Sequence, residues 1–205
     1  MGRVRGKTWM QEHVADAYVK RARNEGMRSR SAYKLEQIAD RDRLLRAGMT
    51  VVDLGAAPGG WSQIAARRVG PGGRVLALDV LDMVSLPGVS FVPGDFRDKA
   101  VVEALERALD GRPVDLVLSD MAPNLSGIAS IDQARLLELA ELALGFALNH
   151  LKPQGNFLVK LFHGSGFDGF AGRMRRHFRE VVTRKPDASR SRSSEVYLLG
   201  RGRKP

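Results

Sequence analysis

Charged side chains stand at three places where the sequence otherwise reads as apolar strand. Lys160 lies among the last residues of one such run, Glu195 stands at the edge of another, and Asp120 follows a third. A buried ammonium group loses several kcal/mol of hydration unless it meets a carboxylate or a wet pocket. Lys160 is therefore predicted to reach an acid or an open site, where a lysine can hold or accept a proton.

A glycine-rich loop is the second feature that could do chemistry. Residues 51–63 read VVDLGAAPGGWSQ, and this order of apolar, small and helix-compatible residues predicts strand, tight loop and helix. Glycines let backbone N–H groups approach a ligand, and the start of the helix adds the positive end of its dipole. The G-x-x-x-G-G spacing differs from the G-x-G-x-x-G that holds a pyrophosphate, which favours a nucleoside ligand without one. The alternative is a glycine turn that binds nothing.

Two acids follow predicted strands near this loop. Asp79 stands 24 residues beyond Gly55. In a right-handed βαβ unit this places its carboxylate beside the glycine loop, where it can accept hydrogen bonds from both ribose hydroxyls. Asp95 follows the next strand and can accept from an exocyclic amine, with Phe96 close to a purine. Either acid could instead be only a helix cap.

The elements that must position these residues form an α/β pattern. About seven strands alternate with helices until the end, where two strands come close together. We expect a Rossmann-like, seven-stranded, mostly parallel sheet with an antiparallel last strand and helices on both faces, the architecture of S-adenosylmethionine-dependent methyltransferases. Within it, residues 132–150 are expected to form a long amphipathic helix that Asp132 caps.

Composition limits the class of protein. The chain has 205 residues, 43% of them apolar, enough for a sizeable core. The absence of cysteine excludes disulfides and agrees with a reducing cytoplasm, where we expect the protein to reside. No apolar run approaches the roughly 20 residues that span a bilayer. The four histidines lack ligand-like spacing, so no metal is expected.

The net charge of +10 is concentrated at the two ends of the chain. Residues 1–50 hold 12 Lys/Arg against 6 Asp/Glu, and residues 171–205 hold 11 against 3. This pattern predicts a basic rim that binds nucleic acid around a neutral or acidic pocket. Arg173, Arg175 and Arg176, in a basic helix, are expected to take part. A basic surface that serves only solubility is the alternative.

Five segments, spread over nearly the whole chain, resemble one family. RSRSAYKL, VVDLGAAPGGWSQ, DMAPN, LVKLF and SSEVY, in this order, are similar to the FtsJ (RlmE) ribosomal RNA 2′-O-methyltransferases. The resemblance implies a catalytic tetrad of Lys34, Asp120, Lys160 and Glu195. It also implies S-adenosylmethionine contacts at Gly59, Trp61, Asp79, Asp95 and Asp120.

The same resemblance implies a substrate and a domain organisation. The expected target is a uridine in the A-loop of 23S rRNA, modified in the large (50S) ribosomal subunit by a monomeric enzyme without metal. We expect a basic N-terminal arm and helix at 1–28, a methyltransferase domain at 29–200 and a basic tail at 201–205.

Methyl transfer to a ribose needs a group that relieves the 2′-hydroxyl of its proton, because that hydroxyl is a poor nucleophile at neutral pH. Lys160 is expected to do this, either as a neutral acceptor or as a charged group that stabilises the alkoxide; both roles remain open. Lys34 and Glu195 would orient the ribose and Lys160, and Asp120 would touch both the lysine and the methionine part of the cofactor.

Two other functions remain open. A nucleotide-binding oxidoreductase would bind nicotinamide, although the glycine spacing disfavours it. A ribosome-assembly factor without catalysis would keep the pocket but not need the tetrad.

Overall fold

The computed structural model describes residues 17–189 and 193–205. Residues 1–16, which belong to the expected basic N-terminal arm and helix, lie outside these ranges. The helices are α2 (Ala17–Asn24), α3 (Ala32–Asp42), α4 (Gly60–Val69), α5 (Lys99–Leu109), α6 (Ala129–His150) and α7 (Phe167–His177). The strands are β1 (Thr50–Leu54), β2 (Arg74–Asp79), β3 (Val89–Pro93), β4 (Val114–Ser119), β5 (Leu151–Phe162), β6 (Phe178–Arg184) and β7 (Glu195–Arg203).

The strands form one seven-stranded sheet in the order β3-β2-β1-β4-β5-β7-β6. Neighbours from β3 to β5 pair in parallel, and β7 pairs antiparallel with both β5 and β6. This arrangement confirms the predicted mostly parallel sheet with an antiparallel last strand. The order reverses beside β1 and β4, and ligands bind outside the carboxyl ends of strands at such a point.

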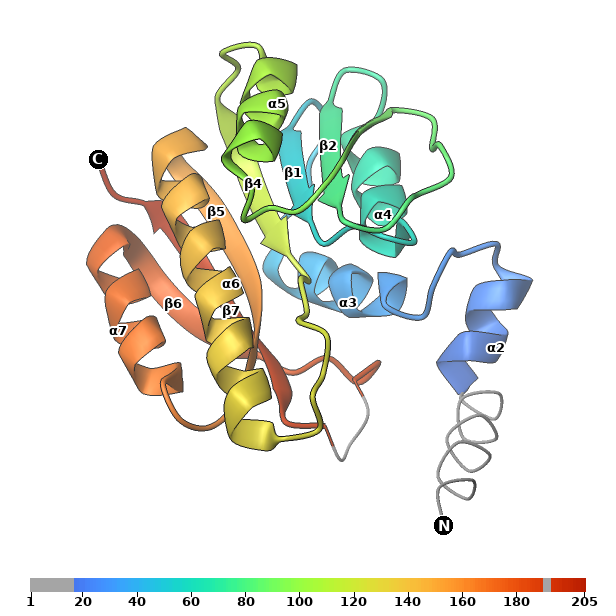
Figure 1. The fold of residues 1–205 in the computed structure, drawn as a ribbon. Helices are drawn as coiled ribbons and strands as arrows, with labels where there is room; N and C mark the ends of the chain where they lie inside the picture. The colour runs from blue at the N-terminus through green and yellow to red at the C-terminus, as the bar shows by residue number, and fades with distance from the viewer. Residues whose placement is uncertain (1–16, 190–192) are drawn as a thin grey trace.

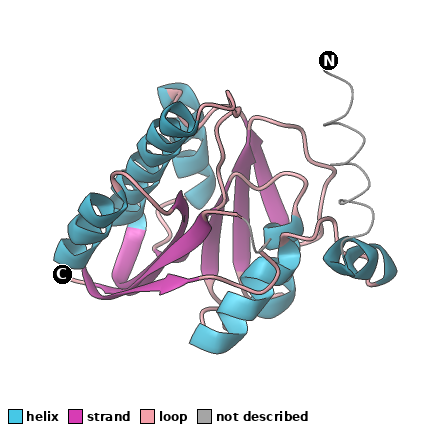
Figure 2. Ribbon diagram, turned by 90° about the horizontal axis from the view of Figure 1, so that it is seen from below, coloured by secondary structure: helices cyan, strands magenta, loops and turns pink. Residues whose placement is uncertain are grey.

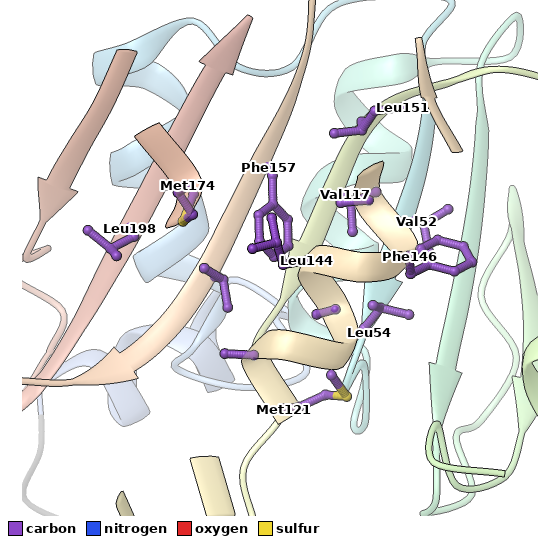
Figure 3. Close-up of a cluster of buried hydrophobic side chains, with 14 of the residues drawn as sticks. Val52, Leu54, Val117, Met121, Leu144, Phe146, Leu151, Phe157, Met174 and Leu198 are labelled. Carbon is purple, nitrogen blue, oxygen red and sulfur yellow. The ribbon is translucent and has the colours of Figure 1, made fainter. Parts of the chain in front are cut away.

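Helices cover both faces of the sheet, as predicted (Figures 1 and 2). Alternate strand residues point to opposite faces. One set, which includes Val51, Leu116 and Tyr197, packs with α3 and α4. The other set, which includes Val52, Val117 and Leu198, packs with α5, α6 and α7. Figure 3 shows part of this second core between α6 and the strands, with Met121 at its lower end. The sheet is therefore buried on both sides, and its carboxyl edge is where polar side chains can gather.

An ion-pair cluster fastens α3 to the far edge of the sheet. The Arg184 guanidinium donates to both carboxylate oxygens of Asp42 at 2.7 Å, and Arg201 donates to the Asp42 backbone oxygen at 2.8 Å. Asp42 is 6% exposed. The pairs tie the end of α3 to β6 and β7, so the helix that carries Lys34 is fixed against the strand that carries Glu195.

Two details differ from the sequence-based expectation. Helix α6 begins at Ala129, and Asp132 lies within its first turn. Its carboxylate accepts hydrogen bonds from Ser126 N and Oγ at 2.7 Å and from Gly127 N at 3.1 Å. Asp132 thus fixes the loop that enters the helix instead of standing at the N-cap position. Strand β7 continues to Arg203, into the segment expected to be a basic tail.

Candidate active site

Lys160 and Asp120 form an ion pair at the carboxyl edge of the sheet. Asp120 directly follows β4, and its N–H donates to Leu54 O at 3.0 Å, which extends the sheet ladder by one residue. Lys160 Nζ lies 3.0 Å from Asp120 Oδ1 and donates to Asp120 O at 2.5 Å. Lys160 is 7% exposed. The lysine therefore meets a carboxylate, as the burial of its charge requires.

Lys34 and Glu195 form a second pair. Lys34 Nζ donates to Glu195 Oε1 at 2.5 Å, although 161 residues separate the two along the chain. Their side chains are only 14% and 15% exposed. Burial alone would raise the pKa of the Glu195 carboxyl, but the charge and hydrogen bond of Lys34, helped by Lys160 and Tyr197, lower it below its usual value. Glu195 is thus held as a carboxylate.

Tyr197 joins the two ion pairs. Its hydroxyl lies 3.1 Å from Asp120 Oδ1 and 3.1 Å from Glu195 Oε1. Burial, followed by the charges of the same two acids, raises the pKa of Tyr197 well above its ordinary value, so the hydroxyl keeps its proton. A hydroxyl has one proton to donate. Tyr197 must therefore share that proton between two carboxylates or alternate between them.

The structure brings Lys34, Asp120, Lys160 and Glu195 together, two pairs bridged by one phenol. None of the four points into bulk water. Tyr197 was missed as a functional residue in the sequence. The signal for it was its spacing: residues i and i+2 of a strand share a face, so Tyr197 had to lie on the same side as Glu195.

A second buried acid lies in strand β1, which leads into the glycine loop. Asp53 is fully buried, and its Oδ2 accepts a hydrogen bond from Ser62 Oγ, in the first turn of α4, at 2.6 Å. No hydrogen-bond partner exists for Oδ1 among the described residues. Burial raises the pKa of Asp53 to about 7, the charges of Asp120 and Asp79 add to this, and the Ser62 hydrogen bond opposes it. Asp53 is thus partly protonated near neutral pH.

A cavity of about 370 Å³ opens beside this cluster at the ends of β2, β3 and β4. Its volume is in the range of small-molecule sites. Gly55 forms part of its wall, and a Cβ there would lie 2.6 Å from Met121 N, so only glycine fits this close approach. The lining residues are Gly55, Leu78, Asp79, Val80, Gly94, Asp95, Phe96, Arg97, Met121, Ala122, Pro123, Asn124, Arg135, Glu138 and Leu139.

Asp79 and Asp95 both line the cavity, as the sequence predicted. The Asp79 carboxylate accepts from Ala57 N at 2.9 Å and from Leu81 N at 2.8 Å, which fixes its orientation between two loops. The Asp95 carboxylate accepts from Arg97 Nη2 at 2.6 Å and from Arg97 N at 2.9 Å. Hydrogen bonds from Arg97 lower the pKa of Asp95. Asp95 is therefore held as an ionised acceptor, and Asp79 is an acceptor whose orientation two backbone N–H groups fix.

Gly59, Trp61 and Asp120, also predicted to contact the cofactor, lie outside the residues that line the cavity. Trp61 is 2% exposed, its indole N–H donates to Ser31 O at 2.8 Å, and its ring centroid lies 5.5 Å from that of Tyr197. Gly59 precedes α4 with φ 105°. Trp61 therefore supports the ring of Tyr197 from the interior, and direct contact of the three residues with a cofactor stays a prediction.

The basic helix α7 does not face this site. The helix begins near the carboxyl end of β5, on the side of the site, and ends at the opposite edge of the sheet. There β6 begins, and its first residue, Phe178, pairs with Arg203. Arg175 and Arg176 are in its last turn, and Arg173 pairs with Glu141 of α6. This geometry places Arg175 and Arg176 away from the reacting group and does not test the expectation that the three arginines take part in binding nucleic acid. Lys20 and Arg23, exposed on α2, lie on the element that precedes α3 and Lys34.

The described residues contain no group of three or more His, Cys, Asp or Glu side chains that could hold a metal ion. No helix within 17–189 or 193–205 is long and apolar enough to cross a membrane.

Comparison with known proteins agrees with this geometry. The family model for FtsJ-like methyltransferases matches residues 27–203. The ribosomal RNA large subunit methyltransferase E of Methylobacillus flagellatus is 59% identical over 198 residues, which cover 97% of this chain and 96% of that protein. The enzyme of the same name from Chromobacterium violaceum is 60% identical over 196 residues, 96% of each chain. A crystal structure of a protein assigned as a ribosomal RNA methyltransferase from Plasmodium falciparum superposes with TM-score 0.78 at 26% identity, over 86% of this chain and 98% of that one. By its sequence and its fold, this chain belongs to the FtsJ-like methyltransferase family.

Proposed function

We propose that this protein transfers a methyl group from S-adenosylmethionine to the ribose 2′-hydroxyl of a uridine in the A-loop of 23S rRNA, acting in the cytoplasm on the large ribosomal subunit. The single observation that carries the proposal is the double ion pair Lys160–Asp120 and Lys34–Glu195, bridged by Tyr197 and placed next to the cavity. The names of the relatives support the choice of large-subunit rRNA.

The residues of the cavity fit the cofactor. A nucleoside needs hydrogen-bond acceptors for its ribose hydroxyls and its exocyclic amine. The side chains of Asp79 and Asp95, both in the wall, offer such acceptor oxygens. Because Gly55 has no Cβ, its backbone can lie close to Met121 in the wall, and any larger residue would clash there. Leu78, Val80 and Phe96 give the apolar surface on which a purine can pack. When bound, S-adenosylmethionine would supply an activated methyl group on a sulfonium.

The charged cluster would prepare the acceptor hydroxyl. Lys160, held by Asp120 and nearly inaccessible to water, would either take the 2′-hydroxyl proton or stabilise the alkoxide as it forms. S-adenosylmethionine would supply the methyl carbon to the 2′-oxygen and would keep, on its sulfur, the electron pair of the bond that breaks. The proton of the 2′-hydroxyl would leave through Lys160 or to solvent. Lys34 and Glu195, locked to each other, would hold the ribose in line.

The test is methyl transfer from labelled S-adenosylmethionine to large ribosomal subunits that lack the modification, followed by mass-spectrometric mapping of the modified nucleotide. Lys160→Ala is expected to lower turnover by about 10²- to 10⁴-fold, the usual contribution of general acid–base catalysis. Its affinity for S-adenosylmethionine should stay within a few-fold of that of the unmodified protein, because Lys160 does not line the cavity. Turnover at the normal rate in this variant would remove Lys160 from its proposed role.

The same assay addresses the other two functions. A factor without catalysis would bind subunits but transfer no label, and an oxidoreductase would bind nicotinamide instead of S-adenosylmethionine. Four buried or half-buried charges held in two pairs are costly to maintain without a chemical use, which favours catalysis.

A further inference from the structure

The loop between β2 and β3, residues 80–88, contributes Val80 to the wall of the cavity and packs on Ala56 and Ala77 only through Met83 and Leu86. Only Met83 of these residues is buried, and Val80, Leu81 and Val84 are 62%, 65% and 80% exposed. Val80 nevertheless lines the cavity, and the N–H of Leu81 helps to orient Asp79. A segment with so few buried contacts opens readily unless polar contacts fix it. Something outside the loop must hold it in place.

That contact comes from Arg28, which lies far away in sequence, just before α3. Its guanidinium donates through Nη1 to Val84 O and to Pro58 O, the latter at 3.2 Å, and through Nη2 to Ser85 O at 2.8 Å. All three acceptors are backbone carbonyls, two in loop 80–88 and one in the glycine loop. The planar fork of an arginine suits such a set of acceptors, whereas the single ammonium of lysine does not.

The base of Arg28 is fixed as well. Its backbone N–H donates to Gln63 Oε1 at 3.1 Å, and Gln63 Nε2 donates to Gly26 O at 2.9 Å, so the segment 26–28 is pinned to α4. The stem of Arg28 also closes over Gly59, where a Cβ would lie 3.0 Å from Arg28 Cδ and 2.9 Å from Met83 Sδ. Arg28 therefore joins α4, the glycine loop and loop 80–88 in one arrangement.

We propose that Arg28 is a positioning residue for the cofactor: it holds loop 80–88 against the glycine loop and so shapes the wall of the cavity that contains Asp79 and Val80. The inference rests on the proposed function, since S-adenosylmethionine is the ligand assigned to that cavity. It gives an arginine of the basic N-terminal region a structural task at the cofactor site, distinct from contact with RNA phosphates.

The experiment is calorimetric titration of the full-length protein with S-adenosylmethionine, in the absence of RNA. Arg28→Met keeps a stem that covers Gly59 but removes every donor, and it is expected to raise Kd at least tenfold. Such a change corresponds to about 1.4 kcal/mol, near the lower end of what a hydrogen bond to a charged group contributes. Arg28→Lys should lie between this variant and the unmodified protein. Arg112→Met, which removes an exposed arginine between α5 and β4, is the matched control and should stay within twofold.

A second readout keeps the proposal testable where stability changes. Hydrogen exchange of the cofactor-free protein should show faster exchange in residues 80–88 for Arg28→Met than for Arg112→Met, with the strands unchanged. If Arg28→Met binds S-adenosylmethionine with the normal Kd, the proposal is overturned, and a raised KM for ribosomal subunits alone would then assign Arg28 to RNA contact. Failure of the unmodified protein to bind S-adenosylmethionine would instead overturn the proposed function.

Discussion

Asp53→Asn offers a test of the electrostatics beneath the glycine loop. The Asp53 carboxyl is fully buried with one oxygen unpartnered among the described residues, and burial raises its pKa from 3.8 to about 7. An acid whose pKa is higher in the folded protein binds more protons there than in the unfolded chain. The free energy of unfolding therefore falls as pH rises from about 4 to about 7.

The size of the effect follows from these two values. The pKa of Asp53 is 3.8 in the unfolded chain and about 7 in the folded protein. This difference lowers the free energy of unfolding by about 1.7 kcal/mol at pH 5 and by about 4.3 kcal/mol at pH 8. Asparagine cannot ionise, so its own cost is the same at both pH values. The stability of Asp53→Asn relative to the unmodified protein should rise by about 2.6 kcal/mol between pH 5 and pH 8.

Urea denaturation at pH 5, 6, 7 and 8 measures this difference, because urea adds no ionic screening and the midpoint and slope give the free energy of unfolding directly. Asp82→Asn, the same change at an exposed carboxylate of loop 80–88, is the control and should show less than 0.5 kcal/mol of change, as is usual for surface substitutions. Parallel pH profiles for Asp53→Asn and the unmodified protein would refute the argument, since they would mean that Asp53 ionises alike in the folded and unfolded states.

Three further predictions follow from the site and the fold. Tyr197→Phe removes the hydroxyl that bridges Asp120 and Glu195. In steady-state methyl transfer it should lower kcat about tenfold with little change in KM for S-adenosylmethionine. An unchanged kcat would mean that the shared proton has no role. Replacing Lys20 and Arg23 together by alanine should weaken binding to RNA and reduce the slope of log K against log salt by up to about 2. The same change at Arg175 and Arg176 should leave that slope unchanged. The opposite ranking would show that α7 faces the RNA. Asp42→Ala leaves Arg184 without its buried partner and should lower the free energy of unfolding, measured by urea denaturation, by about 3 kcal/mol. A loss below 1 kcal/mol would contradict this prediction.

The sheet was predictable because its signals are local. Apolar runs of strand length alternate with helical patterns, and this alternation alone implies a mostly parallel sheet. The places of Asp79 and Asp120 follow from the same rule, since each ends or follows a strand and the ends of parallel strands share an edge. The pairing of Lys34 with Glu195 does not follow from local pattern, because it depends on how α3 packs against β7, and only the family resemblance indicated it.

The sequence also could not show which end of α7 faces the site. Charge counts identify a basic helix, but the edge at which Arg175 and Arg176 lie depends on the direction of the chain between β5 and β6. The role of Arg28 was hidden for a similar reason. Its acceptors are backbone carbonyls of residues 58, 84 and 85, and carbonyls carry no signature in a sequence.

The register of β7 links the two cores of the protein to the charged cluster. Val196 and Leu198 are buried with α6 and α7, while Tyr197 and Leu199 are buried on the opposite face with α3 and α4. A shift of one residue would turn both Tyr197 and Glu195 toward the second core, with α6 and α7, and place an aliphatic side chain beside Asp120. The polar partners of Glu195 and Tyr197 lie on one face of the sheet, so they favour the register that pairs Tyr197 with Lys160 and Glu195 with Phe162. The polar contacts of the site therefore help to set the register of the strand that supplies Glu195 and Tyr197.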